Sequence, residues 1–295
     1  MSTKKTVILF GASGLLGAEL LRAFTSDSYT VVAPSRAELD VTDSAALADL
    51  FARTHPDLVI NAAASIDVDA IENDPYPAWQ INALAAGAIA RSLGQPDTRH
   101  AHLIHISSNY VFGDAQEHYR EDDTPSPVNT YGETKALGEA LTELYCKKAG
   151  INYRIIRTSW LYSPHKETFV DRVAKTLLKG ETIEASPTQF GNLTFAPDLA
   201  HAVAQMCGEE APPPGIYHLV NNVASPRGGV SRYEIAVCIA ETIGAPLSLV
   251  QKSAHPVAFI AKRPDHAVLI NTKASPLPPW DDSLRAYIRM KYLSQ

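Results

Sequence analysis

Tyr131 and Lys135 stand four residues apart at the start of a segment, Thr130–Ala149, that is long enough for a helix. Residues at positions i and i+4 lie on one helix face, so this spacing predicts that the phenol and the ammonium are neighbours. An unperturbed phenol has a pKa of about 10, and an adjacent ammonium favours the phenolate and lowers that pKa. The pair is therefore a candidate for general acid–base catalysis.

Three glycines lie in one turn, between an apolar run at Thr6–Phe10 and a helical stretch at Leu16–Phe24. Gly11 can turn tightly, Gly14 lets a pyrophosphate approach the backbone, and Gly17 lets the helix pack against the strand. A helix that starts here directs free N–H groups and its positive dipole end at a phosphate. Ordinary strand–helix turns rarely carry three glycines at this spacing, so the motif predicts a dinucleotide cofactor.

The end of the second apolar run indicates which dinucleotide binds. Tyr29–Ala33 is followed by Ser35 and Arg36. An acidic residue here would accept from a ribose 2′-hydroxyl, whereas an arginine accommodates a 2′-phosphate. Ser35 and Arg36 therefore favour NADPH, and a solvated loop charge is the alternative interpretation of Arg36. Glu38 and Asp40 follow closely, so NADH use stays open.

Ser108 follows a fourth apolar run, His102–Ser107. The carboxyl end of a parallel strand borders the crevice in which a doubly wound fold holds its ligand. We therefore expect Ser108 to hydrogen-bond a substrate carbonyl oxygen, while Tyr131 supplies a proton and the cofactor supplies hydride. A Tyr-x-x-x-Lys spacing alone is common on helices, but its order after the glycine turn and the strand-end serine makes the combination specific.

The elements that must position these residues alternate up to about residue 160. The apolar runs are Thr6–Phe10, Tyr29–Ala33, Asp57–Asn61, His102–Ser107 and Tyr153–Arg157, and the helical stretches are Leu16–Phe24, Ser44–Arg53, Pro77–Leu93 and Thr130–Ala149. This alternation predicts an α/β fold with a Rossmann-like, doubly wound parallel sheet. We expect residues 1–162 to form the NADP(H)-binding domain, with an added strand near 215–220. Residues 163–295, where prolines interrupt the rhythm, should form mainly a smaller C-terminal substrate lobe interleaved with it.

The composition argues against several classes of function. Lys and Arg number 26 against 32 Asp and Glu, and the net charge of −6 disfavours nucleic acid or an anionic membrane as a partner. The three cysteines are too far apart for a disulfide framework and fit a reducing, cytoplasmic location. No apolar run approaches the roughly 20 residues of a membrane helix. His102 and His105 point to opposite faces of a strand, so no metal site is predicted.

The chain resembles, nearly end to end, the dTDP-4-dehydrorhamnose reductase family of the extended short-chain dehydrogenase/reductases. The matching segments, in family order, are Gly11–Gly17, Leu39–Asp43, Asn61–Ala64, Ser107–Gly113, Tyr131–Glu139, Arg157–Tyr162, Arg263-Pro264 and Pro278–Trp280. The resemblance implies reduction, by NADPH or NADH, of the 4-keto group of a nucleoside-diphosphate 6-deoxy sugar. That sugar nucleotide is the expected partner, and a homodimer stays open.

Residue by residue, the resemblance implies a catalytic set of Ser108, Tyr131 and Lys135. It places Asp40 and Val41 beside the adenine. The residues expected to bind the cofactor are Gly11, Ser13, Gly14, Leu15, Leu16, Gly17, Ser35, Arg36, Asp40, Val41, Ala62, Ala63, Ala64, Tyr131 and Lys135. The residues expected to bind the substrate are Ser108, Asn109, Tyr110, Trp160 and Arg263.

The substrate end is less well defined than the cofactor end. Tyr110 and Trp160 could stack on a base or sugar, or belong to the core. The guanidinium fork of Arg263 fits a diphosphate, and a surface ion pair is its alternative. Asn109 stands where the family usually has Asp, and Thr188–Thr194 replaces the family's Asp-Gln-x-Gly-x-Pro-Thr pattern. The sugar therefore stays open.

Two other functions stay open as well. A nucleotide-sugar epimerase of the same superfamily would use the same catalytic residues, whereas a dehydratase would carry Asp-Glu where this chain has Asn109-Tyr110. A non-catalytic, NADP-binding regulatory subunit, such as that of methionine adenosyltransferase, is similar in three segments. These are Gly14–Gly17, Tyr119–Asp122 and Tyr131–Glu139.

Overall fold

The computed structural model describes residues 4–26, 28–208, 210–225, 227–253 and 259–294. Its central sheet has six parallel strands in the order β11-β6-β4-β3-β1-β2. These strands are β1 (Lys5–Phe10), β2 (Tyr29–Val32), β3 (Leu58–Asn61), β4 (His102–Ser108), β6 (Tyr153–Thr158) and β11 (Gly215–His218). The predicted doubly wound parallel sheet is confirmed, and the added strand β11 lies at its edge.

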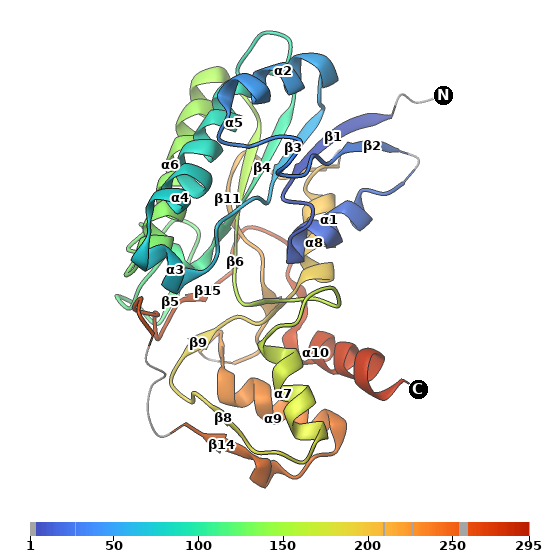
Figure 1. Cartoon of the computed structure of the whole chain (residues 1–295), viewed down its shortest axis with the longest axis vertical. Helices are drawn as coiled ribbons and strands as arrows, with labels where there is room; N and C mark the ends of the chain where they lie inside the picture. The colour runs from blue at the N-terminus through green and yellow to red at the C-terminus, as the bar shows by residue number, and fades with distance from the viewer. Residues whose placement is uncertain (1–3, 27, 209, 226, 254–258, 295) are drawn as a thin grey trace.

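Helices cover both faces of this sheet (Figure 1). Those on one face are α2 (Ser44–Thr54), α5 (Ala85–Leu93) and α6 (Thr130–Ala149), and those on the other are α1 (Leu15–Ala23) and α8 (Ala196–Gln205). Successive β1 residues alternate between the two layers. Val7 and Leu9 pack in the core with α1 and α8, whereas Ile8 and Phe10 pack in the core with α2 and α5. Burial on both faces explains why the strand is apolar from Val7 to Phe10.

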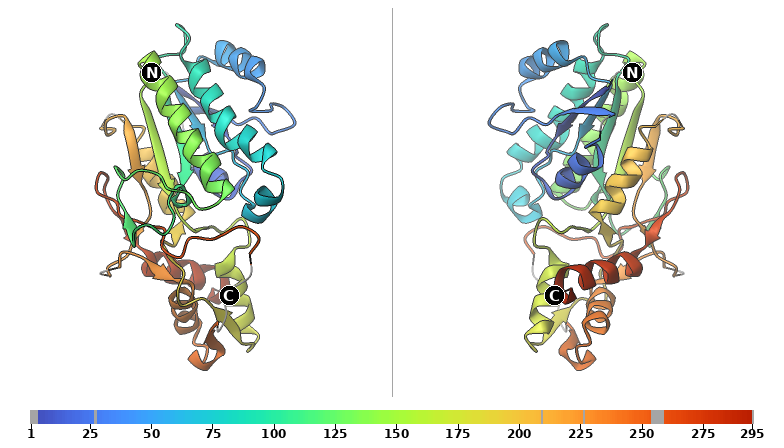
Figure 2. Two further views of the ribbon diagram at one scale, coloured as in Figure 1. Left: turned by 90° about the vertical axis from the view of Figure 1, so that its left-hand side faces the viewer. Right: turned by 90° about the vertical axis from the view of Figure 1, so that its right-hand side faces the viewer.

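Apart from α8 and β11, which belong to the sheet domain, most of the chain after residue 160 builds the lower half of the molecule in Figure 1. Its main elements are α7 (Phe169–Leu178), β8 (Ile183–Ala185), α9 (Arg232–Ile243), β14 (Val250–Lys252) and α10 (Trp280–Ile288). α9 begins with a capping box, in which Ser231 and Glu234 each accept the other's backbone N–H. Val173, Ile239 and Leu284 join the three helices in a core of their own. In both side views of Figure 2 this lobe lies below the helices that cover the sheet.

Short elements connect the lobe with the loops of the sheet. β15 (Val268–Leu269) pairs in parallel with β5 (His118–Tyr119), far earlier in the chain. The remaining elements are α3 (Val68–Asn73), α4 (Tyr76–Ala78), η1 (Trp79–Leu84), η2 (Asn109–Val111), β7 (Leu161–Tyr162), β9 (Phe190–Gly191), β10 (Thr194–Phe195), β12 (Asn221–Asn222), β13 (Val230–Ser231), η3 (Leu247–Leu249), β16 (Leu277–Pro279) and η4 (Arg289–Leu293). No helix within the described ranges is long and apolar enough to cross a membrane.

The helix expected over Pro77–Leu93 is interrupted by η1, which is a π-helical turn. Asn82 lies within it, and its side chain accepts the Ser65 N–H at 2.8 Å and donates to the Thr134 hydroxyl at 3.0 Å. A π turn carries one more residue than an α turn and is often found where a side chain has a specific task. The π turn thus occurs where Asn82 binds Ser65 and Thr134, and these contacts could not be predicted from the spacing of apolar residues.

Candidate active site

A cavity of about 350 Å³ opens at the carboxyl edge of the sheet. In a doubly wound sheet this is the edge at which ligands bind. The predicted site residues that line it are Gly14, Leu15, Leu16, Gly17, Ala62, Ala64, Ser108, Asn109, Tyr110, Tyr131, Lys135 and Trp160. Those outside its lining are Gly11, Ser13, Ser35, Arg36, Asp40, Val41, Ala63 and Arg263. The structure thus brings the glycine turn and the three expected catalytic residues to one cavity.

The glycine turn is held tightly against the end of β3. Gly11 has a φ of +81°, and a Cβ on it would lie 2.7 Å from the Ala62 backbone. A Cβ on Gly17 would lie 2.0 Å from the Gly11 carbonyl oxygen. α1 starts after Gly14, which offers no side-chain cap, so first-turn N–H groups are left for a ligand. This uncapped helix start fits the diphosphate of a dinucleotide.

The loop after β2 carries both a cation and an acid. Ser35 donates from its backbone N–H and its hydroxyl to Glu38 Oε2, each at 2.8 Å, and these bonds hold the Glu38 pKa below its usual value. Asp40 accepts the N–H and hydroxyl of Thr42 at 2.9 and 2.8 Å, which lowers its pKa in the same way. Arg36 is exposed on this loop. The guanidinium expected to meet a 2′-phosphate is therefore accessible, while the Ser35 hydroxyl is engaged by Glu38.

α6 brings Tyr131 and Lys135 against the end of β4. Asn129 caps the helix by accepting the Gly132 N–H at 2.9 Å. A Cβ on Gly132 would lie 2.1 Å from the Tyr110 carbonyl oxygen, so glycine lets the helix start touch the segment that follows Ser108. The rings of Tyr110 and Tyr131 meet edge to face, with their centres 5.6 Å apart. One helix start thereby positions the phenol beside the strand-end serine.

The expectation that Lys135 lowers the Tyr131 pKa is wrong for this structure. Burial raises the pKa of Tyr131 to about 12, and only a hydrogen bond with Ser108 opposes that shift. The Lys135 ammonium instead donates to the Ile106 carbonyl at 2.7 Å. Burial lowers its own pKa to about 8, against the opposing charge of Glu139 one helical turn further on. Removal from water outweighs the pairing of the two groups on the helix face.

A buried network lies behind Lys135. Glu139 accepts from the Ser107 hydroxyl at 2.5 Å and forms an ion pair with Arg157 at 2.7 Å. Arg157 also donates to the Glu121 carbonyl oxygen at 3.3 Å. Ser107 lies between Ile106, whose carbonyl oxygen accepts from Lys135, and Ser108. By binding Ser107, the Glu139 carboxylate therefore holds the part of β4 that carries the Ile106 carbonyl and the Ser108 hydroxyl.

Of two residues expected at the substrate, Trp160 lines the cavity and Arg263 does not. Trp160 lines the cavity with a φ of +33°, a strained value for a residue other than glycine. A Cβ on Gly191 would lie 2.8 Å from its ring, so glycine makes room for the indole. Arg263 forms an ion pair with Asp69 at 3.0 Å and does not line the cavity. The structure therefore pairs Arg263 with Asp69, and the role expected for Arg263 at the diphosphate stays a prediction.

Known proteins are similar in sequence to the chain that builds this site. Residues 5–292 match the family model described as the RmlD substrate binding domain. The chain belongs to this family. It is 31% identical over 292 residues to the dTDP-4-dehydrorhamnose reductase of Escherichia coli strain K12, covering 93% of this chain and 94% of the relative. It is 33% identical over 289 residues to the spore coat polysaccharide biosynthesis protein SpsK of Bacillus subtilis strain 168, covering 96% of each chain.

Among solved structures, the fold is similar to a crystal structure of dTDP-4-dehydrorhamnose reductase from Bacillus anthracis in complex with NADP. The TM-score is 0.87 at 27% identity, covering 98% of this chain and 100% of that one. The resemblance to this reductase family, inferred from the sequence motifs, is confirmed.

Within this family, Asn109 is a departure that the structure explains. Its side chain is buried and donates to the Ala267 carbonyl oxygen at 2.9 Å, next to β15. An ionised aspartate has no proton to donate to a carbonyl, whereas an amide does. Asn109 therefore ties the end of β4 to the lobe, and its donor is already used by the protein itself.

The cavity also contains residues that were not expected there. Thr158, the last residue of β6, and Ser159, which follows it, line the cavity, and their buried hydroxyls have no partner in the described part of the chain. Their position directly after an apolar strand run is the same signal that identifies Ser108. Ile66 and Val68 also line the cavity. No spacing rule points to these two, because Ile66 lies in the irregular segment after β3 and Val68 only begins the short helix α3.

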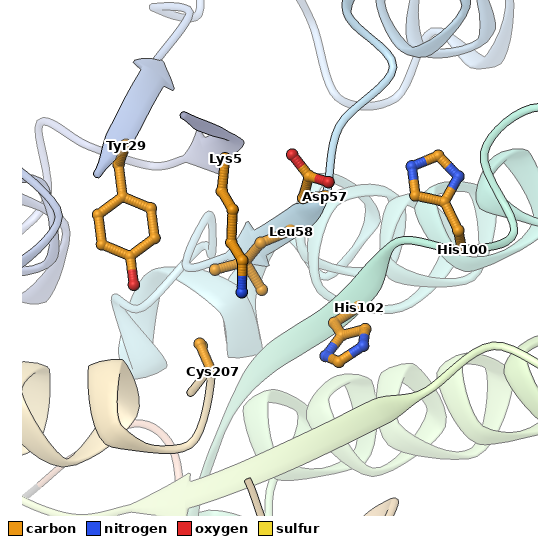
Figure 3. Close-up of a pocket in the computed structure, with 7 residues that line it drawn as sticks. All are labelled: Lys5, Tyr29, Asp57, Leu58, His100, His102 and Cys207. Carbon is orange, nitrogen blue, oxygen red and sulfur yellow. The ribbon is translucent and has the colours of Figure 1, made fainter. Parts of the chain in front are cut away.

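A smaller cavity of about 130 Å³ lies at the amino edge of the sheet (Figure 3). Lys5, Tyr29, Leu58 and His102, which begin four of the strands, line it. Burial, together with the charges of Arg154 and Lys5, lowers the pKa of His102. Across the described ranges, no three His, Cys, Asp or Glu side chains are placed to hold a metal ion. None of the expected catalytic residues lines this cavity.

Proposed function

We propose that this chain is an NADPH-dependent ketoreductase that reduces the 4-keto group of a nucleoside-diphosphate 6-deoxy sugar. The observation that carries the proposal is that Ser108, Tyr131 and Lys135 line one cavity with the glycine turn. The named activity of the Escherichia coli relative supports the substrate class, and the NADP in the Bacillus anthracis reductase structure supports the cofactor.

Each of the three residues has a distinct role in this proposal. The raised pKa keeps Tyr131 protonated at neutral pH, so its hydroxyl can give a proton to the ketone oxygen. The Ser108 hydroxyl, which is near enough to Tyr131 to lower its pKa, polarises the same oxygen. Lys135 has two donors left beyond its bond to Ile106, and these can hold ribose hydroxyls of the cofactor. NADPH, when bound, supplies the hydride.

The test is to mix the protein with NADPH and a dTDP-4-keto-6-deoxy sugar generated in situ, following nicotinamide absorbance and the sugar product. We expect one NADPH to be oxidised for each ketone reduced. An epimerase would change the sugar configuration without net NADPH oxidation. A regulatory subunit would bind NADPH and reduce no sugar, and either result would overturn the ketoreductase proposal.

We further propose a cytoplasmic location, because Cys146, Cys207 and Cys238 are all buried and unpaired, as is usual for thiols in a reducing compartment. The division into residues 1–162 and 163–295 is also a proposal. It is supported by the separate core that joins α7, α9 and α10. A homodimer stays a prediction, which light scattering during size-exclusion chromatography would test.

A further inference from the structure

A cation that the sequence motifs do not single out lies behind Trp160, beside the substrate end of the cavity but outside its lining. Arg232 is the first residue of α9. Its guanidinium carbon lies 3.9 Å from the centre of the Trp160 ring and 4.8 Å from that of Phe169. Stacking on aromatic rings covers the faces of a guanidinium and leaves the N–H groups at its edge free to donate. Because Trp160 lines the cavity, Arg232 stands beside it.

Arg232 has no acidic partner among the residues that the structure describes. Arg263, by contrast, is neutralised by Asp69. Arg232 is half-buried, so part of the residue keeps contact with solvent. Burial and the like charge of Arg172 lower the Arg232 pKa to about 10. The surroundings therefore disfavour this positive charge, and a bound anion would stabilise it.

The charge of Arg232 is directed at the residues of the cavity. Tyr110 lines the cavity next to Tyr131, and the guanidinium groups of Arg232 and Arg263 both lower its pKa, although burial raises it overall. Arg172, on α7, adds an exposed cation on the side of Arg232. The surroundings of Tyr110 are thus electropositive, and within the described chain Arg263 has an acidic partner whereas Arg232 has none.

We propose that Arg232 binds the diphosphate of the substrate, with Trp160 and Phe169 holding the plane of its guanidinium. This inference rests on the proposed function, since it assigns the diphosphate of that same sugar nucleotide. A guanidinium fork can donate two parallel hydrogen bonds to phosphate oxygens. Trp160 is fixed by its backbone conformation and by Gly191, so Arg232 stacks on a ring that cannot easily turn away. The diphosphate role considered for Arg263 thereby passes to Arg232.

The test compares the affinities of thymidine diphosphate and thymidine, measured by competition calorimetry, in the full-length protein and three variants. Arg232→Gln should weaken thymidine diphosphate about 10- to 100-fold, as expected for a lost charge-assisted phosphate contact. Thymidine and NADPH should bind as before. Arg232→Lys keeps the charge without the fork and should lose less. Arg263→Gln is the matched control and should leave the ratio of the two affinities unchanged.

Four outcomes would overturn the inference. Equal losses for thymidine diphosphate and thymidine in Arg232→Gln would show that Arg232 only supports Trp160. A selective loss of the diphosphate in Arg263→Gln instead would return the role to Arg263. If the parent protein bound NADPH but no nucleoside diphosphate, the proposed function would fail and this inference with it, whereas an unchanged Arg232→Gln in a parent that binds would reject the inference alone.

Discussion

The two ends of the cavity are built in different ways. At the cofactor end, Gly11–Gly17 supply the turn within seven consecutive residues, and Tyr131 and Lys135 share one turn of α6. The spacing within each motif sets its own turn or helix face, and contacts with neighbouring strands, such as those of Gly11 with Ala62 and of Lys135 with Ile106, then hold it in place. The spacing of residues in the sequence therefore determines the local geometry directly.

At the substrate end, the contacts join segments that are far apart in the chain. Asn109 donates to Ala267, and Trp160 stacks on Arg232. Such contacts exist only after the lobe has packed against the sheet, so a residue's role here depends on the whole fold. The difference teaches that catalytic chemistry and substrate choice can change separately in this molecule, one by local motif and the other by lobe contacts.

The largest expected effect belongs to the local motif. Tyr131→Phe removes the proton donor and should lower kcat about 10²- to 10⁴-fold, while NADPH affinity is retained. Tyr110→Phe is the matched control, because its ring touches that of Tyr131 in the same cavity. It should leave kcat within a few-fold of the parent. Steady-state reduction of the keto sugar measures both, and a parent-like kcat for Tyr131→Phe would reject the assigned mechanism.

The sequence predicts the cofactor end of the cavity better than the substrate end. The parallel sheet follows from strand–helix alternation, and the meeting of Ser108, Tyr131 and Lys135 at one cavity was expected from their positions. The direction of the Tyr131 pKa shift could not be predicted, because it depends on how deeply the phenol is buried, and the spacing of residues does not reveal burial.

The substrate lobe shows what the sequence leaves undetermined. The ion pair of Arg263 with Asp69 and the stacking of Arg232 on Trp160 join residues that no short motif contains. The contacts of Asn82 likewise come from a π turn that interrupts the expected helix. In each case a partner distant in sequence decides the local outcome.

The buried pair between the two ends should dominate stability. Arg157 and Glu139 are 1% and 4% exposed, so Arg157→Leu leaves a buried carboxylate without its cation. The free energy of unfolding should fall by about 3–5 kcal/mol. Arg53→Leu is the control, since its ion pair with Asp49 is 67% exposed on both sides and should contribute about 0–1 kcal/mol. Urea unfolding curves compare them, and equal losses would contradict the assignment.

The cofactor end also makes a prediction about selectivity. Arg36→Ala removes the exposed guanidinium expected at the 2′-phosphate, so NADPH affinity should fall about 10- to 100-fold. NADH affinity should change less than about two-fold, because NADH lacks that phosphate. Fluorescence titration of both cofactors measures the effect. Equal losses for the two would remove Arg36 from this role.

The contact of Asn109 with the lobe should tolerate Asp poorly, although Asp is the usual residue of the family. Asn109→Asp places a carboxylate against the Ala267 carbonyl oxygen, which should lower the free energy of unfolding by about 1–3 kcal/mol at neutral pH. A protonated carboxyl can donate again, so the deficit should shrink as pH falls through its pKa. Urea unfolding at several pH values measures this. A variant as stable as the parent at neutral pH would contradict the contact's importance.

The smallest expected effect concerns the charge of Lys135. It tests whether the Tyr131–Lys135 motif depends on the buried residues around it. With its pKa lowered to about 8, Lys135 loses its proton as pH rises through that value, so kcat/KM should be highest below it and fall above. Tyr131, with a pKa of about 12, stays protonated over this range. The alkaline limb therefore reports the ammonium.

Glu139→Gln removes the negative charge that favours this ammonium, while its amide oxygen can still accept from Ser107. The alkaline limb should move to lower pH by on the order of one pH unit. Glu143→Gln, one helical turn further along α6 and paired with Lys147, should leave the limb where it is in the parent. If the alkaline limb moves equally in both variants, or in neither, a group other than Lys135 sets it. The Tyr131–Lys135 motif would then depend less on the buried network of Glu139 and Arg157 than its position implies.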